Sequence, residues 1–130
     1  MTKHRVGDLT RRDTPALNKE MPIRRAVAVL VDARAAAAPV LDNDGRLIGI
    51  LSQKDCFRPA LHASYHREWS GTVSQHMSSN VITVDIEDEV IRAAEMFLNH
   101  PHRVFPVLSG ASVAGLLYRS DVLAFLLRFG

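Results

Sequence analysis

The chain has 130 residues, of which 47% are hydrophobic and 23% are charged, and its formal net charge is +2. This composition excludes an intrinsically disordered chain, and no apolar run approaches the roughly 20 residues of a membrane span. Basic residues are scattered and only 6% of residues are aromatic, a pattern that does not indicate nucleic-acid binding. The single Cys56 cannot form an internal disulfide, and the N-terminus lacks the apolar stretch of a signal peptide. We therefore expect a cytoplasmic protein that binds neither nucleic acid nor membrane.

The first half of the chain predicts five elements in the order strand, helix, strand, strand, helix. They are a short strand near 16–17, a helix over 23–31, strands at 39–41 and 47–51, and a closing helix within 56–61. Apolar residues recur at helical spacing within 23–31, which predicts a helix that buries one face. The turn at 42–45 reads Asp-Asn-Asp-Gly, a strong hairpin signal. Because proline is unfavourable inside a helix, we expect Pro59 in the first turn of the closing helix.

The second half repeats this pattern. Val6–Thr10 aligns with Val73–Met77, the apolar helix positions align with positions in 90–98, and Pro39–Leu41 aligns with Pro106–Leu108. The second half thus predicts a short strand near 81–84 and a closing apolar helix over 122–127. Because each repeat alone exposes an apolar sheet face and an apolar helix face, we expect the two to pack together. The prediction is an α+β fold of two βαββα repeats, residues 1–66 and 67–130.

A short motif stands at the end of the last strand in each repeat. It reads Gly, two apolar residues, three variable residues and Asp, at 49–55 and at 115–121. A carboxylate at a helix start can accept two hydrogen bonds from a ribose diol, and the helix N-terminus suits a phosphate. Ser52 and Asp55 also have the spacing of a capping box, which needs no ligand. In the second copy Tyr118 replaces the serine while Asp121 persists, which favours a ligand or the helix dipole there.

The twofold repeat, the Pro-Val-Leu strand, the Asp-Gly turn and the segment Gly-Ile-Leu-Ser-Gln-Lys-Asp together resemble tandem cystathionine-β-synthase-type (CBS) domains, or a Bateman module. The resemblance extends from about Val6 to Leu127. It implies two repeats packed as a pseudo-twofold pair, homodimerisation, and an AMP, ATP or S-adenosylmethionine ligand in the clefts between repeats. In such a module the aspartate holds the ribose, and hydroxyl side chains lie near the ribose and the phosphate.

By position, the resemblance implies two ligand sites that each combine residues of both repeats. The first site consists of Ser52, Lys54, Asp55, Asn80 and Ile82. The second site consists of Thr10, Asp13, Ser120 and Asp121.

Three further residues make the two implied sites unequal. His102 and Arg103 are expected near the phosphate, whereas their first-repeat counterparts are Ala35 and Ala36. Tyr118 takes the usual Ser/Thr position, where it stacks on a base, blocks the cleft or packs against the protein. We therefore do not expect both sites to be occupied equally.

We expect a non-catalytic regulatory module that requires no cofactor and passes ligand binding to a partner protein. No nucleophile-base set and no Walker-type phosphate loop occurs in the sequence. The alternative is a ligand-independent dimerisation or interaction scaffold whose clefts are filled by side chains such as Tyr118. A metal or redox sensor ranks last. His62 and His66 have the spacing of one helical face, although two histidines without a third ligand are usually surface or linker residues. Cys56 stands at a helix start, where a thiol pKa can be lowered, but apolar packing is the commoner fate of a lone cysteine.

Overall fold

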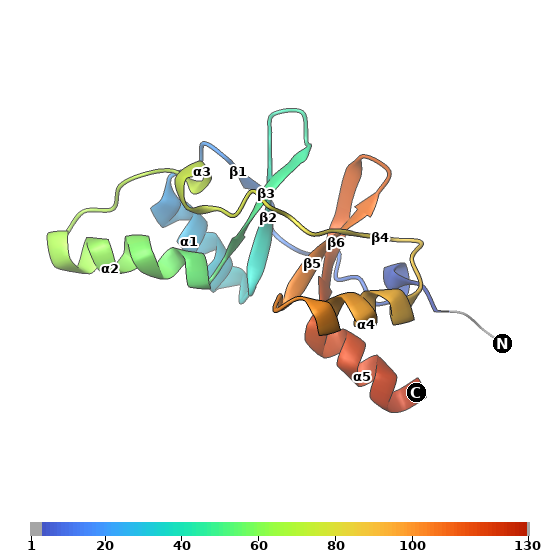
Figure 1. The fold of residues 1–130 in the computed structure, drawn as a ribbon. Helices are drawn as coiled ribbons and strands as arrows, with labels where there is room; N and C mark the ends of the chain where they lie inside the picture. The colour runs from blue at the N-terminus through green and yellow to red at the C-terminus, as the bar shows by residue number, and fades with distance from the viewer. Residues whose placement is uncertain (1–3, 130) are drawn as a thin grey trace. The chain divides into compact units, whose positions relative to one another are not determined.

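The computed structural model describes residues 4–129, and residues 1–3 and 130 of the two predicted repeats lie outside this range. The chain forms two compact units, which are described separately (Figure 1). Unit 1 consists of Met1–Asp13 and Ile82–Gly130, and unit 2 consists of Thr14–Val81. Each unit therefore contains most of one sequence repeat together with the opening segment of the other. The predicted repeats meet between residues 66 and 67, whereas the chain passes from one compact unit to the other after Asp13 and again after Val81.

Unit 2 contains a three-stranded sheet and two longer helices. Its elements are β1 (Leu17–Asn18), α1 (Ile23–Ala33), β2 (Ala37–Leu41), β3 (Leu47–Ser52), a 3₁₀ turn (Lys54–Cys56), α2 (Phe57–His66) and α3 (Val73–His76). β1 is parallel to β2, and β2 is antiparallel to β3. The predicted hairpin turn is confirmed, and Gly45 adopts φ 81°, a conformation that glycine favours. Pro59 lies in the first turn of α2, as predicted.

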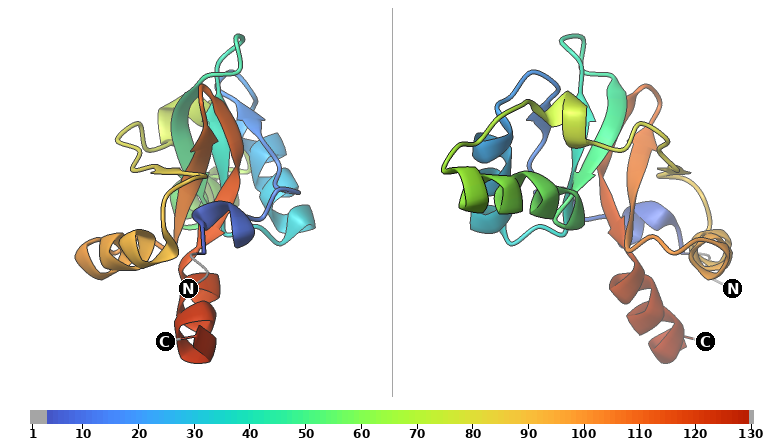
Figure 2. Two further views of the ribbon diagram at one scale, coloured as in Figure 1. Left: turned by 90° about the vertical axis from the view of Figure 1, so that its right-hand side faces the viewer. Right: turned by 60° about the vertical axis from the view of Figure 1, so that its left-hand side comes forward.

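Helices α1 and α2 lie on the same side of the β2–β3 hairpin (Figure 2). The buried core beneath them includes Leu17, Ile23, Leu30 and Leu51. The predicted apolar face of α1 is confirmed in its first part, since Ile23, Ala26 and Leu30 are buried. The prediction is wrong at the C-terminal end of this face, because the Val31 side chain is 64% exposed. The apolar face of this helix is therefore wider than the surface that its own unit covers.

Unit 1 has the same architecture. Its elements are a 3₁₀ turn (Val6–Asp8), β4 (Val84–Asp85), α4 (Val90–Asn99), β5 (Val104–Ser109), β6 (Ser112–Tyr118) and α5 (Arg119–Phe129). β4 is parallel to β5, and β5 is antiparallel to β6. Phe105 is fully buried and stacks on Phe97 of α4, with 4.2 Å between the ring centroids. Leu98, which ends the predicted apolar face of α4, is 85% exposed, so that prediction is also wrong at its end.

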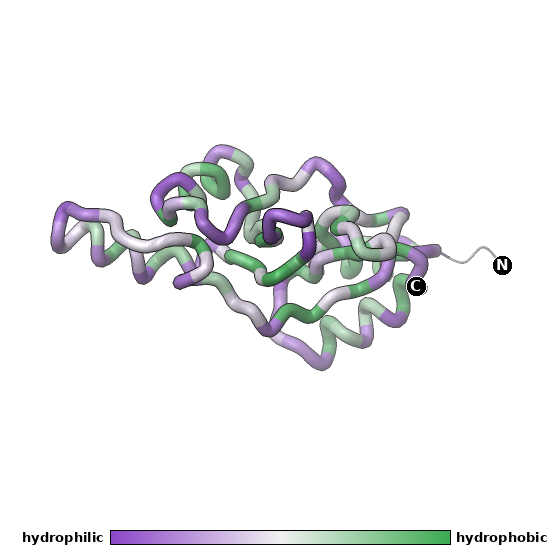
Figure 3. The backbone as a smooth tube through the Cα atoms, turned by 90° about the horizontal axis from the view of Figure 1, so that it is seen from above, coloured by the Kyte–Doolittle hydropathy of each residue, from purple (hydrophilic) through white to green (hydrophobic). Residues whose placement is uncertain are grey.

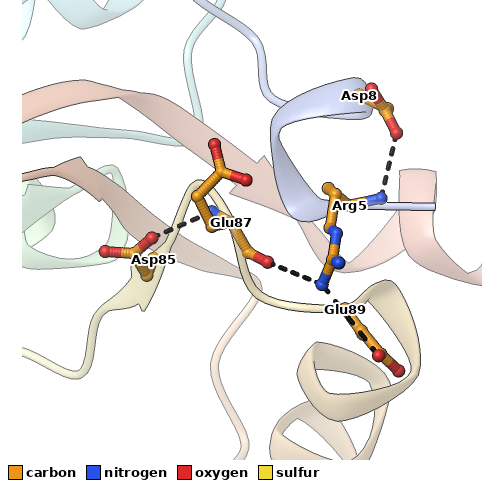
Figure 4. Close-up of polar contacts among 5 residues, drawn as sticks. All are labelled: Arg5, Asp8, Asp85, Glu87 and Glu89. Carbon is orange, nitrogen blue, oxygen red and sulfur yellow. Dashed lines mark hydrogen bonds and ion pairs between the residues drawn. The ribbon is translucent and has the colours of Figure 1, made fainter. Parts of the chain in front are cut away.

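The opening segment of the chain is fixed to unit 1 by backbone and side-chain contacts. Val6 N donates to Asp88 O at 2.8 Å, and Gly7 N donates to Ile86 O at 2.9 Å. Arg5 Nη1 donates to the carbonyl oxygen of Glu87 at 3.1 Å and lies 4.0 Å from Glu89 Oε1 (Figure 4). These contacts hold residues 5–8 beside the turn that precedes α4.

Apolar and polar residues alternate in short stretches along the backbone (Figure 3). Within residues 4–129, no helix has both the length and the apolar character needed to cross a bilayer.

Candidate functional site

Asp121 lies in the first turn of α5 and binds Arg11, a residue 110 positions away in the chain. Arg11 Nε donates to Asp121 Oδ2 at 2.8 Å, and Arg11 Nη2 donates to Asp121 Oδ1 at 3.0 Å. The guanidinium carbon also lies 4.0 Å from the centroid of the Tyr118 ring, within the range of a cation–π contact. The hydrogen bonds to Asp121, with smaller contributions from Tyr118 and Asp13, raise the pKa of Arg11. Both carboxylate oxygens of Asp121 thus have a cationic partner inside unit 1.

The backbone of Arg11 is held against β6 by a two-hydrogen-bond bridge. Arg11 N donates to Leu116 O at 2.9 Å, and Leu116 N donates to Arg11 O at 3.0 Å. Gly115 permits this close approach, since a Cβ atom on it would overlap the carbonyl oxygen of Arg11. Thr10, a predicted site residue, donates its hydroxyl to Val6 O at 2.8 Å. The motif glycine therefore has a defined role, which is to admit the segment that carries Arg11.

The equivalent acid in unit 2, Asp55, has a different partner. Ser52 N donates to Asp55 Oδ2 at 2.9 Å, and Asp55 N donates to Ser52 Oγ at 3.2 Å. The capping box that the sequence allowed is therefore formed. Within residues 4–129, no hydrogen bond or ion pair engages the second oxygen, Asp55 Oδ1. The cap consequently leaves one carboxylate oxygen available to a further donor.

Ser78 takes in unit 2 the place that Arg11 has in unit 1. Ser78 and Ile50 exchange two backbone hydrogen bonds of 2.9 Å, as Arg11 and Leu116 do. A Cβ atom on Gly49 would lie 2.9 Å from Ser78 O, so this glycine also permits the approach. The two copies of the motif thus differ in a correlated way. In the copy whose acid has a serine cap, the bridging residue is Ser78, and in the copy where Tyr118 replaces the serine, the bridging residue is Arg11, which binds the acid.

The other predicted residues of the first site divide between the units. Asn80 and Lys54 are exposed in unit 2 and Ser52 and Asp55 are half-buried there, whereas Ile82 packs on the core of unit 1. Lys54 and Asp55 line an open hollow of about 1070 Å³. Arg58 and His62 of α2, together with His76 of α3, line the same hollow. Cationic and imidazole groups therefore surround one end of the first predicted site.

All the predicted residues of the second site belong to unit 1. Arg103, Tyr118 and Ser120 line a hollow of about 490 Å³ between α4 and α5. Asp13 is exposed, and Thr10 and Asp121 have the partners described above. The Nδ1 atom of His102 is buried and has no hydrogen-bond partner within residues 4–129.

Sequence reasoning missed Arg11. The internal alignment contains the signal, because Arg11 is paired with Ser78 and stands opposite the copy in which Tyr118 replaces serine. The alignment alone does not show that the Arg11 side chain reaches Asp121, since that contact depends on the bridge to Leu116.

The features that suggested a metal or redox sensor have other environments in the structure. The rings of His62 and His66 lie 4.5 Å apart on α2. Among residues 4–129, no group of three or more His, Cys, Asp or Glu residues is arranged to hold a metal. Burial, with a smaller contribution from the Asp55 charge, raises the pKa of the Cys56 thiol to about 11. Cys56 therefore packs in the apolar core of unit 2, as is common for a lone cysteine, and its thiol pKa is raised rather than lowered.

The chain is similar to solved structures over nearly its whole length. CBSX2 in complex with AMP matches with a TM-score of 0.80 and 22% identity, over 96% of this chain and 97% of that one. The CBS domain pair of protein MJ0100, in complex with 5′-methylthioadenosine and S-adenosyl-L-methionine, matches with a TM-score of 0.82 and 20% identity. That match covers 99% of this chain and 100% of the other. At these identities the likeness establishes the α+β fold.

A sequence relative and a family model extend the comparison. A 33.4 kDa protein in the ribosomal RNA operon of Thermofilum pendens is 23% identical over 116 residues, which are 89% of this chain. The chain spans only 37% of the length of that relative. The sequence model of the CBS domain matches twice, over residues 6–61 and 73–128. The chain therefore belongs to the CBS domain family and carries two copies of the domain.

Proposed function

We propose that this chain is a non-catalytic regulatory module that binds an adenosine-containing ligand of the AMP, ATP or S-adenosylmethionine class. The observation that carries this proposal is the pair of acids, Asp55 and Asp121, at equivalent helix starts in the two units. Beside each acid, the last strand of one repeat is bridged by the opening segment of the other, at Ser78 and at Arg11. Residues of both repeats therefore meet at each acid, as the implied ligand sites require.

The capping box at Asp55 is compatible with ligand binding. Asp55 Oδ2 accepts from Ser52 N, and Oδ1 is open to accept a hydrogen bond from a ribose hydroxyl. Lys54 and Arg58 line the same hollow and supply positive charge for a phosphate. Two proteins of the same fold were solved with adenosine compounds, CBSX2 with AMP and MJ0100 with 5′-methylthioadenosine and S-adenosyl-L-methionine. These observations support Asp55 as the acid that binds the ribose more readily, since one of its oxygens has no partner within residues 4–129.

Asp55→Asn tests the proposal with little disturbance of the fold, because an asparagine oxygen still accepts from Ser52 N. We expect calorimetry to show saturable binding of AMP or S-adenosylmethionine to the unmodified protein. A lost charge-assisted hydrogen bond is expected to weaken that binding by about tenfold or more in Asp55→Asn. Asp32→Asn, which alters an exposed acid on α1, is the matched control and should bind as the unmodified protein does. No binding of any of these compounds at millimolar concentration would contradict the proposal.

A ligand-independent scaffold is the second candidate, and one observation favours it. Arg11 and Tyr118 occupy the neighbourhood of Asp121 with side chains of the protein itself. Unchanged thermal stability in the presence of every adenosine compound tested, together with a stable dimer, would support the scaffold.

We also propose that the module forms a homodimer through its helix pairs. Unit 2 has an apolar hollow of about 400 Å³ between α1 and α2, and unit 1 has its repeat equivalent of about 490 Å³ between α4 and α5. Exposed apolar side chains border them, namely Val31 and Phe57 in unit 2 and Leu98 and Leu123 in unit 1. Contiguous exposed apolar surface of this kind is typical of protein interfaces. A second copy presents the same surface, which suits a symmetric contact. The regulated partner protein and a cytoplasmic location stay predictions.

A further inference from the structure

The Asp121 carboxylate is fully engaged before any ligand arrives. Arg11 binds both of its oxygens, at 2.8 and 3.0 Å, and the same guanidinium lies over the Tyr118 ring. A ribose diol that binds Asp121 must therefore displace Arg11 from at least one oxygen. Asp55 imposes no such exchange, since its partner Ser52 uses only one oxygen and Ser78 stands where Arg11 would be.

When a ribose displaces Arg11 from Asp121, the Arg11 guanidinium loses the carboxylate that accepted its two hydrogen bonds. The Arg11 side chain is 48% exposed, so it is free to turn toward a new partner. Asp13 is the other carboxylate that acts on Arg11, and it is itself exposed to solvent. A phosphate offers the guanidinium the same planar, two-oxygen recognition that the carboxylate gave. An uncharged nucleoside offers no replacement, and the Arg11–Asp121 pair then opposes its binding.

We propose that Arg11 makes the Asp121 site selective for adenine nucleotides that carry a phosphate, by exchanging its ion pair with Asp121 for an ion pair with that phosphate. The ribose hydroxyls take the oxygens of Asp121, and the freed Arg11 takes the 5′-phosphate of the same ligand. This inference rests on the proposed ligand binding, and it names the ligand class at one of the two sites. Arg11 is then a specificity-determining residue, and Ser78 leaves the Asp55 site without this selection.

The test compares AMP with adenosine, which differ only in the phosphate. Calorimetry uses protein with Asp55→Asn, which weakens the first site, and adds either Arg11→Gln or Arg103→Gln. With Arg11 present we expect AMP to bind at least about tenfold more tightly than adenosine, because a charge-assisted pair forms only with the nucleotide. In Arg11→Gln we expect this ratio to fall to about threefold or less, while adenosine binds more tightly because Asp121 is released.

Arg103→Gln is the competing variant, because Arg103 was also expected near the phosphate but forms no ion pair with Asp121 among residues 4–129. The inference predicts that Arg103→Gln lowers the AMP preference less than Arg11→Gln does. An unchanged ratio in Arg11→Gln, or a ratio that falls only in Arg103→Gln, would overturn the inference while leaving ligand binding intact. Absence of binding by both compounds to the Asp55→Asn protein and also to the unmodified protein would overturn the proposed function itself. Thermal melting of each variant shows whether it is folded.

Discussion

Asp55 and Asp121 show that equivalent residues of a repeat can take different roles when their neighbours change. Asp55 shares a capping box with Ser52, and Asp121 lacks that partner because Tyr118 stands in its place. The unsatisfied acid is instead neutralised by Arg11, which also stacks on the tyrosine that removed the cap. One substitution in the motif is thus accompanied by a second one in a distant segment, and together they make the two sites chemically distinct.

Cys56 illustrates how burial decides the chemistry of a single residue. Because burial raises the pKa of its thiol to about 11, the thiol stays protonated at neutral pH. We expect iodoacetamide to modify the folded protein far more slowly at pH 8 than it modifies a free cysteine, with the rate rising toward pH 11. Mass spectrometry across this pH range measures the rate, and an apparent pKa below 8 would contradict the burial argument.

The same shift sets the direction of a stability change with pH. The folded protein favours the neutral Cys56 thiol. The contribution of this thiol to the free energy of unfolding is therefore complete below the thiol pKa in the unfolded chain, about 8.5. It is lost as the pH rises from there toward 11. Cys56→Ala should lack this part of the alkaline loss of stability.

At the scale of elements, Gly115 links the motif to the opening segment of the chain. We expect Gly115→Ala to lower the free energy of unfolding by about 2 kcal/mol or more, since its Cβ would push Arg11 away from β6. Gly110→Ala is the control, because Gly110 adopts φ 61° but has open space around it. Gly110→Ala should lower the free energy of unfolding by about 1 kcal/mol, through backbone strain alone. Urea denaturation measures the free energy of unfolding of both variants. A loss in Gly115→Ala equal to or smaller than the loss in Gly110→Ala would contradict the role of the bridge.

The repeat and the periodicity predicted which elements form and where. The helix over 23–31, the hairpin turn at 42–45 and the place of Pro59 in the first turn of α2 all follow from local signals, and the structure confirms them. Val31 and Leu98 were expected to be buried and are exposed, because amphipathic spacing does not show how much of a face the unit covers. The 3₁₀ turn before α2 has no periodic signal and was not predicted.

The contact of Arg11 with Asp121 was beyond the reach of the sequence for a physical reason. It joins residues 110 positions apart, and it exists only because the opening segment pairs with β6 of the other repeat. Local patterns predict strands and helices, but they do not tell which repeat receives an opening segment. The candidate acids, by contrast, were predictable, because their motif fixes them at a strand end and a helix start.

At the scale of the whole molecule, the two exposed helix pairs predict self-association. We expect light scattering after gel filtration to give the mass of a dimer, about twice the 14.4 kDa of one chain. Leu98→Asp, on the 85% exposed face of α4, should shift the protein toward the monomer without unfolding it. Arg92→Asp places the same charge at an exposed polar position of α4 and is the matched control. A monomeric unmodified protein at micromolar concentration would contradict the proposed dimer.

The most direct test of the central claim is a crystal structure of the protein grown with saturating AMP. We predict density for the nucleotide beside Asp55, with a ribose hydroxyl donating to the Oδ1 atom that the cap leaves open and with the Ser52 hydrogen bonds unchanged. Density for AMP at some other place, or an empty Asp55 neighbourhood at saturating nucleotide, would contradict the account.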